Sequence, residues 1–196
     1  MNEAPFVFRG KRNYVLVADI LNAVLHGFYG HTKTHELDYV VKRPCTTSSY
    51  RLVAREDATP SEEIQAIAQL RDIHHHVLIM PEGAPVTERM PCLEKEMATY
   101  FSYNTKLPNK PIVHVDKLYK GEPFTKTCVA AFKYLLNVCV FHEQRQYLFV
   151  RLRLETTDIS EFSIQFERIF AKRFFEATIS VQGKPCGQIF FGGRTA

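Results

Sequence analysis

The chain has 196 residues, a formal net charge of +4 and a pI near 8.8. This length allows one large domain, or two small fused ones, to bury an apolar core without disulfides or metal. The positive charge is a mild excess spread among many acidic residues. It is compatible with an anionic ligand but does not indicate a nucleic-acid-binding tail.

The cysteines are odd in number, widely spaced and without a CxxC pair, so they give no sign of a disulfide framework or a zinc cluster. We expect buried, reduced thiols, which fits a cytoplasmic protein. We expect no secretory signal, and no apolar segment reaches the roughly 20 residues that a spanning helix requires, so we expect no membrane partner. The cysteines are Cys45, Cys92, Cys128, Cys139 and Cys186.

The first predicted elements are a short strand, FVFR at residues 6–9, and an amphipathic helix. Apolar residues at the i, i+3, i+4 spacing of a helix face predict a helix that starts near Val17 and ends near Gly27 or Gly30. The stretch ELDYVVKRPCTTSSYRLVAR, residues 36–55, then predicts two strands around a turn that contains Pro44.

The middle of the chain predicts a helix, a strand and a long loop. TPSEEIQAIAQL begins with a capping box, in which Thr59 is the N-cap, Pro60 the first helical residue and Glu62 the third. HHHVLIM, residues 74–80, predicts a strand. The Pro- and Gly-containing stretch at 81–96 predicts a loop or broken helix that could border a site.

The second half predicts a strand at 111–115 and a helix from Phe124 or Thr125 to about Phe141. This helix is apolar almost all round, so it must be covered on nearly every side. Four alternating segments follow and predict consecutive antiparallel strands. The stretch FSIQFERIFAKRFFEATISV contains two of them, joined by a turn near Ala171 and Lys172, with most of its phenylalanines facing the helix.

The order of strand, long buried helix and four strands, from Ile112 to Phe191, resembles the hotdog fold. In that fold an antiparallel sheet wraps around one long, mostly apolar helix. The resemblance rests on element order and not on a signature motif, and a cystatin-like or other α+β roll gives a similar order. The fold class expected is therefore α+β and hotdog-like.

The first half looks like a degenerate copy of the second, which suggests a fused double hotdog. When Arg43 is aligned with Arg168, the alternating residues before them match, and Tyr50 takes the place of Phe175. Any two amphipathic hairpins show a similar match, so a true duplication stays open. The expected units are residues 1–109 and 110–196, which share one core.

The motifs that are missing remove several enzyme classes. There is no phosphate-binding GxxxxGK[ST] loop, no GxGxxG after a strand, no HExxH and no GxSxG elbow. The strongest polar cluster is HGFYGHTKTHELD, just after the first predicted helix. Histidine beside a carboxylate can act as a general acid or base. The cluster contains His26, His31, His35, Glu36 and Asp38.

In hotdog dehydratases and thioesterases the catalytic His, Asp or Glu lies near the central helix, so the resemblance makes this location suggestive. Neither family motif is present, neither the His-plus-acidic-helix pattern nor Asp-x-Asn-Gly-His, so no catalytic residue is transferred. The alternative is a polar surface loop with incidental histidines. A second candidate pair, His114 and Asp116, shares a strand face ahead of the long helix and could meet the first cluster if the halves pair.

His74 and His76 offer two imidazoles on one strand face, but no third ligand is visible, so no metal site is expected. Alternating aromatic and basic residues could form a nucleic-acid platform. Strict alternation argues against it, because most phenylalanines lie opposite the charges; Phe170 and Phe174 are the two expected to be exposed.

The sequence therefore predicts a protein that binds an acyl chain or acyl thioester, is a homodimer and uses no cofactor. The resemblance implies a thioesterase, a dehydratase or a relative that has lost catalysis, with lysines and arginines suited to the phosphates of coenzyme A or an acyl-carrier arm. If it is an enzyme, His31 or His35 is the expected base, oriented by Asp38 or Asp116. The alternatives are a non-catalytic interaction module and, third, a weak nucleic-acid binder.

Overall fold

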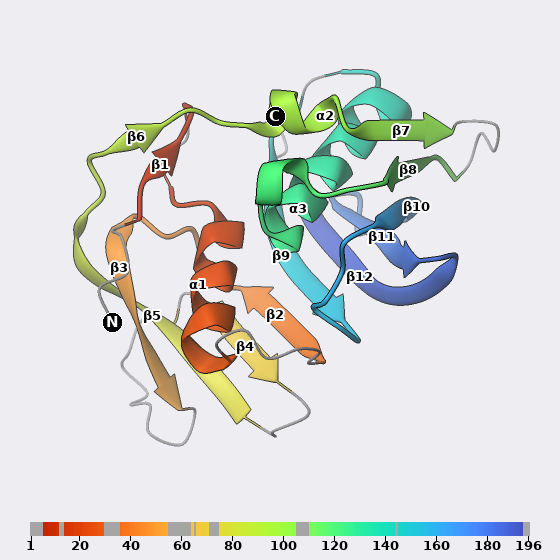
Figure 1. Cartoon of the computed structure of the whole chain (residues 1–196). Coiled ribbons are helices and arrows are strands. Elements are labelled where there is room, and N and C mark those ends of the chain that lie inside the picture. Colours follow the sequence, from red (N-terminus) through yellow and green to blue (C-terminus); the bar gives the residue numbers. More distant parts are fainter. Residues whose placement is uncertain are drawn as a thin grey trace.

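A computed structural model of the chain describes residues 6–11, 14–29, 36–54, 64, 66–70, 75–104, 110–143 and 145–193. In these ranges ten strands form one antiparallel sheet (Figure 1). Two helices, α1 (Val17–Tyr29) and α3 (Phe124–Tyr134), pack against each other and contribute to one apolar core with the sheet. The predicted α+β class, with an antiparallel sheet around a long apolar helix, is confirmed.

The sheet has the strand order β3-β5-β4-β2-β9-β12-β11-β10-β8-β7. Its strands are β2 (Leu37–Val41), β3 (Thr47–Ala54), β4 (Ala66–Leu70), β5 (His75–Pro85), β7 (Phe101–Asn104), β8 (Ile112–Val115), β9 (Tyr147–Leu154), β10 (Phe162–Phe170), β11 (Phe174–Val181) and β12 (Lys184–Gly193). The remaining elements are the paired short strands β1 (Phe8–Arg9) and β6 (Arg89–Met90), the short helix α2 (Glu94–Ala98), a 3-10 turn η3 (Tyr119–Gly121) and a π-helical turn η4 (Leu135–Val140).

The second half has the hotdog arrangement. Strand β8, helix α3 and strands β9 to β12 follow each other along the chain as predicted. In the sheet they take the order β9-β12-β11-β10-β8, and α3 packs against the face that the sheet turns inward.

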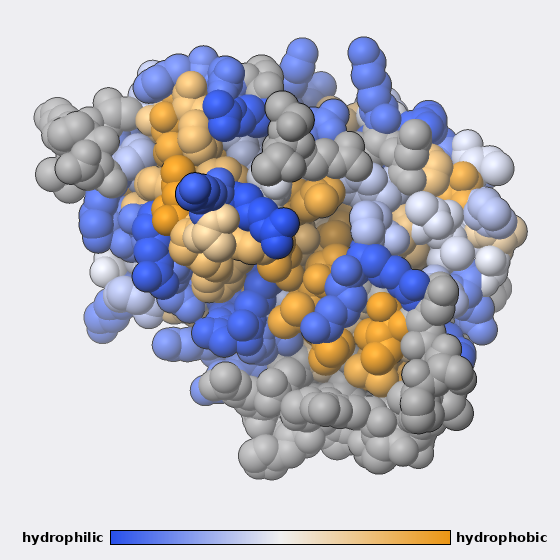
Figure 2. Space-filling model, turned by 180° about the vertical axis from the view of Figure 1, so that it is seen from behind, coloured by the Kyte–Doolittle hydropathy of each residue, from blue (hydrophilic) through white to orange (hydrophobic). Residues whose placement is uncertain are grey.

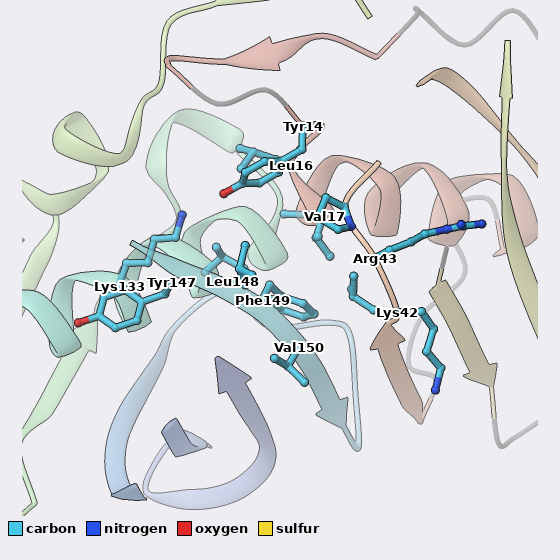
Figure 3. Close-up of a pocket in the computed structure, with 14 residues that line it drawn as sticks. Tyr14, Leu16, Val17, Lys42, Arg43, Lys133, Tyr147, Leu148, Phe149 and Val150 are labelled. Carbon is cyan, nitrogen blue, oxygen red and sulfur yellow. The ribbon is translucent and has the colours of Figure 1, made fainter. Parts of the chain in front are cut away.

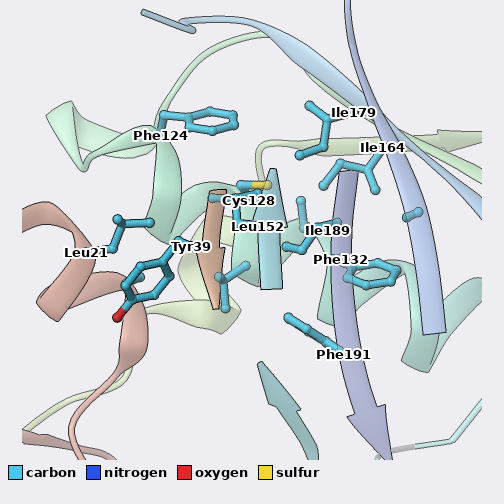
Figure 4. Packing of buried hydrophobic residues seen from close by; sticks show 14 of the residues in the cluster. Leu21, Tyr39, Phe124, Cys128, Phe132, Leu152, Ile164, Ile179, Ile189 and Phe191 are labelled. Atoms are coloured by element: carbon cyan, nitrogen blue, oxygen red, sulfur yellow. The ribbon is translucent and has the colours of Figure 1, made fainter. Parts of the chain in front are cut away.

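Helix α3 is the centre of this half because it is apolar on almost every side. Val129, Phe132, Leu136 and Cys139, which the sequence places on one stripe, are all buried. The ring of Phe132 lies 4.7 Å from that of Phe191 on β12 (Figure 4). The helix continues directly into η4, so the predicted end near residue 141 is confirmed.

The hairpin predicted between residues 162 and 181 is also confirmed. Phe162, Ile164 and Phe166 on β10 point into the core, and β10 pairs with β11 throughout. The chain reverses at Ala171 and Lys172, whose φ angles of 47° and 60° are left-handed. The loop has three residues, Ala171 to Arg173, and the Arg173 N–H donates to the Phe170 carbonyl, 3.3 Å away.

The two halves meet at the centre of the sheet, where β2 pairs antiparallel with β9. The pairing runs from Leu37 opposite Leu154 to Val40 opposite Arg151. Behind this strand pair α1 packs against α3. The strands of both halves therefore belong to one sheet, with a shared core behind it.

The helix predicted from Thr59 is wrong over its described part, because Ala66–Leu70 is strand β4. The capping box itself lies outside the described residues. In β4, Ala66 and Ala68 are fully buried, and the strand is hydrogen-bonded on both sides, to β2 and to β5. Pairing along two edges outweighs the local preference for a helix, which is a weak prior.

The two strands predicted in residues 36–55 are present, but they are not neighbours. Strand β2 lies between β4 and β9, whereas β3 pairs with β5. By position, the counterpart of β2 is β9, since each follows a helix and the two pair at the centre. The sequence alignment pairs residues 37–50 with 162–175, so it matches β2 with β10, whereas the fold matches β2 with β9. The order of the strands in the sheet also differs between the halves: β2-β4-β5-β3 in the first and β9-β12-β11-β10 in the second. Duplication of the units 1–109 and 110–196 stays a prediction.

The stretch predicted as a loop at 81–96 is more regular than expected. Residues 81–85 extend β5, and β6 and the start of α2 follow. Strand β7, at the sheet edge, had no sequence prediction. The cysteines are all free; four are buried and Cys92 is partly buried. None of the described helices is long and apolar enough to cross a membrane.

Candidate functional site

A pocket of about 160 Å³ opens where the two halves meet; we call it the central pocket. It lies at the first turn of α1, the end of β2, the middle of α3 and the start of β9 (Figure 3). Its lining consists of Tyr14, Leu16, Val17, Ala18, Val41, Lys42, Arg43, Pro44, Val129, Lys133, Tyr147, Leu148, Phe149 and Val150.

The walls of the central pocket are predominantly apolar. Leu16, Val17 and Ala18 come from the start of α1, and β9 supplies the run from Leu148 to Val150. Such walls arise because each element turns its apolar side toward the shared core, and the ends of β2 and β9 leave a gap there. An apolar pocket with a few polar groups is the usual form of a small-molecule site.

The cations at the pocket are Lys42, Arg43 and Lys133. The ammonium of Lys133 lies 2.6 Å from the carboxylate of Glu94 on α2, so this charge is compensated. Lys42 is exposed. The Arg43 side chain extends away from the β9 residues (Figure 3), and the part of Arg43 that lines the pocket is its aliphatic stem. The local charge of the rim is positive, which suits an anionic head group more than a cationic one.

Tyr147 supplies a buried hydroxyl next to the pocket. The side chain is only 4% exposed, and its hydroxyl has no hydrogen-bond partner among the residues that the structure describes. Burial raises the pKa of Tyr147 to about 12, opposed by the nearby charge of Arg145 and reinforced by Glu143. The hydroxyl is therefore neutral near pH 7, where it can donate a hydrogen bond but cannot act as a base.

Among the residues that the structure describes, no His, Asp, Glu or Cys lines the central pocket. These are the side chains that could transfer a proton near neutral pH or attack a thioester. The described part of the pocket can therefore bind and orient a ligand, but it contains no complete catalytic group.

A second, smaller cavity of about 30 Å³ adjoins the first and shares Leu16, Ala18 and Val129 with it. Near it, the carboxylate of Asp19 lies 2.9 Å from the ammonium of Lys126 and 3.4 Å from Arg9. Its charges are balanced, unlike those of the central pocket.

Asp38, one of the predicted site residues, lies elsewhere. Its buried carboxylate accepts hydrogen bonds from Nε (2.7 Å) and Nη2 of Arg151, and Arg153 lies 3.4 Å away. Burial by itself would raise the pKa of Asp38, but the hydrogen bond and charge of Arg151, aided by Arg153, outweigh it and lower the pKa. Asp38 thus joins β2 to β9, and a cavity of about 520 Å³ with a mixed polar and apolar lining lies beside it.

His31 and His35 lie outside the described residues, and so does the side chain of His26. In the sequence they follow Tyr29, the last residue of α1, whereas the central pocket uses the first turn of this helix. A role for these histidines in catalysis stays a prediction.

His114 and Asp116 lie far from Asp38 along the sheet. His114 is on β8, with Ser102 and Ser163 as its cross-strand neighbours, and Asp116 is exposed just beyond the strand. Four strands separate β8 from β2. The structure therefore does not bring this pair to Asp38.

His74 lies outside the described residues, and so does the side chain of His76. Among the His, Cys, Asp and Glu side chains that the structure describes, no group of three is arranged to hold a metal ion.

The sequence interpretation missed the central pocket. Its residues come from four segments that are distant in the chain, and most are apolar residues that look like core. The available signal was the pair Lys42 and Arg43, directly after the apolar run Tyr39–Val41, at the end of a strand.

No known protein family and no curated protein sequence matches the chain. Among solved structures, it is similar to the tesB protein of Mycobacterium avium subsp. paratuberculosis, at 11% identity, with 93% of this chain and 88% of that chain covered and a TM-score of 0.45. It is also similar to a candidate thioesterase II from Thermobifida fusca, at 8% identity, 95% and 89% coverage and a TM-score of 0.46.

A third likeness is to the erythromycin dehydratase, at 12% identity, 98% and 84% coverage and a TM-score of 0.47. The hotdog arrangement described above rests on the element order and sheet topology of the chain itself.

Proposed function

We propose that the protein binds the acyl part of a small ligand, such as an acyl thioester, in the central pocket. The observation that carries this proposal is the lining: apolar side chains from both halves enclose one cavity, with cationic side chains only at its edge. An apolar chain gains from leaving water for such a cavity, roughly in proportion to its buried area.

The volume supports a short acyl group. An apolar cavity of about 150 Å³ holds a molecule of benzene, and the central pocket measures about 160 Å³. A group of about six carbons is therefore the expected occupant. Longer chains would need the adjoining cavity as well, beyond the wall that Leu16, Ala18 and Val129 form.

The orientation of the ligand follows from charge. Lys42 is exposed at the rim and no acidic side chain of the described residues lines the pocket, so an anionic head such as a coenzyme A phosphate or a carboxylate would lie there. The apolar tail would then point inward, toward Val129 and Ala18.

The binding proposal does not depend on catalysis. Because no His, Asp, Glu or Cys of the described residues lines the pocket, a non-catalytic binding protein fits the geometry better than a hydrolase or dehydratase. Thioesterase or dehydratase activity remains an alternative that would need His31 or His35. The homodimer also stays a prediction. Sedimentation equilibrium tests it by measuring the molar mass of the protein in solution.

The binding test uses acyl-coenzyme A thioesters and free fatty acids of short, medium and long chains, with thermal shift and native mass spectrometry as readouts. A ligand at 100 times its Kd adds about 2.7 kcal/mol of stability, which raises the Tm of a chain of this size by roughly 5–10 °C. Short chains should give the largest shift. The absence of a shift and of a bound species with every chain would overturn the proposal.

Matched variants locate the site. Val41→Phe should fill the pocket and abolish the ligand-induced shift, whereas Val181→Phe should retain it, since both valines are partly buried against the core and only Val41 lines the pocket. Lys42→Gln should weaken thioester binding, with the exposed Lys184→Gln as its control.

The enzyme alternative has its own test, a hydrolysis assay on the same thioesters. No turnover by the parent protein, or turnover that survives both His31→Ala and His35→Ala, removes the predicted catalytic assignment.

A further inference from the structure

Apolar side chains also reach the surface of this protein. Figure 2 shows them gathered over the middle of one face, with hydrophilic side chains between them. Four large apolar side chains of the described residues are prominently exposed, and two of these are adjacent: Ile169 at 45% and Phe170 at 38%. Both lie at the tip of the β10–β11 hairpin, and neither takes part in the proposed acyl site.

The tip is aromatic as well as apolar. The rings of Phe170 and Phe174 stack at 5.3 Å with an interplanar angle of 22°, and Phe190 on β12 meets Phe170 edge-on at 6.4 Å. Guanidinium groups lie over two of these rings, Arg168 at 5.8 Å from Phe170 and Arg173 at 5.0 Å from Phe174. We call this set the hairpin patch.

The charge of the hairpin patch is positive. Arg168 is compensated, because its Nε lies 2.7 Å from the carboxylate of Glu176. Lys172 and Arg173 are exposed and form no ion pair with any residue of the described chain. Two free cations therefore flank the exposed apolar side chains.

The turn itself keeps an unfavourable backbone. Ala171 and Lys172 both have left-handed φ angles, 47° and 60°, which Asn-Gly or Gly-Gly would adopt at lower cost. A strained turn that keeps a lysine at its tip is the kind of outlier that points to a function.

The hairpin patch and one wall of the central pocket both border Gly192 on β12. A Cβ at this position would lie 3.4 Å from Val150, which lines the pocket, and 3.6 Å from Phe174, which belongs to the patch.

We propose that the hairpin patch docks on an anionic lipid surface. Exposed aromatic and aliphatic side chains enter the boundary between head groups and acyl chains, and lysine and arginine beside them are attracted to anionic lipids. A protruding tip suits a flat, deformable surface, since it requires no concave partner. The sequence predicts no membrane partner because it has no spanning segment, but surface docking requires none.

Docking by itself is independent of the proposed acyl site. Only its purpose, access to water-insoluble acyl ligands, rests on that proposed function. If the protein binds vesicles but no acyl ligand, the docking proposal holds and the acyl-binding proposal fails. If it binds an acyl ligand but no vesicles, the docking proposal fails and the acyl-binding proposal holds.

Cosedimentation tests the proposal, with vesicles of phosphatidylcholine alone and of phosphatidylcholine with phosphatidylserine. The parent protein should pellet with the mixed vesicles and much less with the neutral ones. Lys172→Gln with Arg173→Gln should weaken partitioning roughly 30-fold, since each cation near an anionic leaflet contributes about fivefold. Ile169→Ser with Phe170→Ser should also release the protein.

Controls come from other exposed positions. Tyr103→Ser, at a side chain that is 53% exposed on β7, and Lys184→Gln should leave vesicle binding unchanged. An unchanged melting temperature shows that a hairpin variant is folded. If the variant with Ile169→Ser and Phe170→Ser does not fold, the variant with Lys172→Gln and Arg173→Gln decides whether the proposal holds. Equal binding to both vesicle types, or unchanged binding of the charge variant, overturns the proposal. Binding of a single-stranded oligonucleotide through the same two cations, without vesicle binding, would assign the patch to nucleic acid instead.

Discussion

Replacement of Asp38 by Asn tests the bond that joins the two halves of the sheet. The side chain of Asp38 is 7% exposed, while its partners Arg151 and Arg153 are 32% and 42% exposed. Removing one member of a fully buried pair costs about 3–5 kcal/mol, and exposed pairs contribute about 0–1 kcal/mol. Because solvent screens the arginines, we expect a loss of about 2 kcal/mol.

The pH dependence of this loss has a definite sign. The pKa of Asp38 is lowered in the folded protein from its ordinary value of 3.8, so its contribution is fully present above that value and disappears as the pH falls through the lower, folded pKa. The difference in stability between parent and Asp38→Asn should therefore be constant from about pH 5 to pH 8 and shrink below about pH 4.

The assay is urea unfolding at several pH values, with thermal melts as a second measure. A loss of 2 kcal/mol corresponds to a Tm about 4–8 °C lower for a chain of this size. Glu167→Gln is the control, since it breaks the exposed pair with Lys110 (2.9 Å) and should cost less than about 0.5 kcal/mol. A loss no larger than that of the control, or one that is undiminished at pH 3, would refute the reasoning.

Three further changes have expected outcomes. Tyr39→Phe should raise stability by about 1 kcal/mol in urea unfolding, because the hydroxyl of Tyr39 is fully buried without a hydrogen-bond partner in the described part of the chain; a clear loss would reveal a hidden hydrogen bond. Gly187→Ala should cost about 1–3 kcal/mol, because its Cβ would lie 2.4 Å from the Arg153 carbonyl oxygen, whereas Gly192→Ala, with contacts no closer than 3.4 Å, should be tolerated. Val129→Ala should lower the free energy of unfolding by about 1.5–2 kcal/mol. It should also shift the preferred ligand in thermal-shift assays to longer chains, because the wall between the two cavities becomes thinner. An unchanged chain-length preference would contradict this.

The second half of the fold was predictable because its pattern is local. Helix α3 is apolar on almost every side, and strands β9 to β12 each contain a stretch of alternating residues, so each element can be identified from its own residues. The first half was less predictable. Strand β4 has only five residues and follows a capping box, and its strand character depends on two neighbours that no local pattern specifies.

The candidate site was harder to predict than the fold. The polar residues that attracted attention, Asp38 and His114, take part in sheet pairing or lie far apart along the sheet. The central pocket is lined mainly by apolar side chains, which sequence patterns assign to the core. A cavity is a place where packing is incomplete, and incomplete packing depends on the relative positions of elements and not on residue type.

The π-helical turn at the end of α3 has a consequence for how the chain tolerates insertions and deletions. In η4 the Phe141 N–H donates to the Leu136 carbonyl, 2.9 Å away, so this turn holds one residue more than an α-helical turn. Deleting one residue from Leu135–Val140 would let the turn relax to an α-helix. Every later side chain would keep its helical position, while inserting one elsewhere in α3 would rotate the following side chains by about 100°.

Such an insertion would move the ring of Phe141 away from the two rings that it contacts. Their centroids lie 5.4 Å away in Phe175 and 6.5 Å away in Tyr147. The chain can therefore lose one residue from η4 at a low cost in stability, whereas the same helix does not tolerate the gain of one.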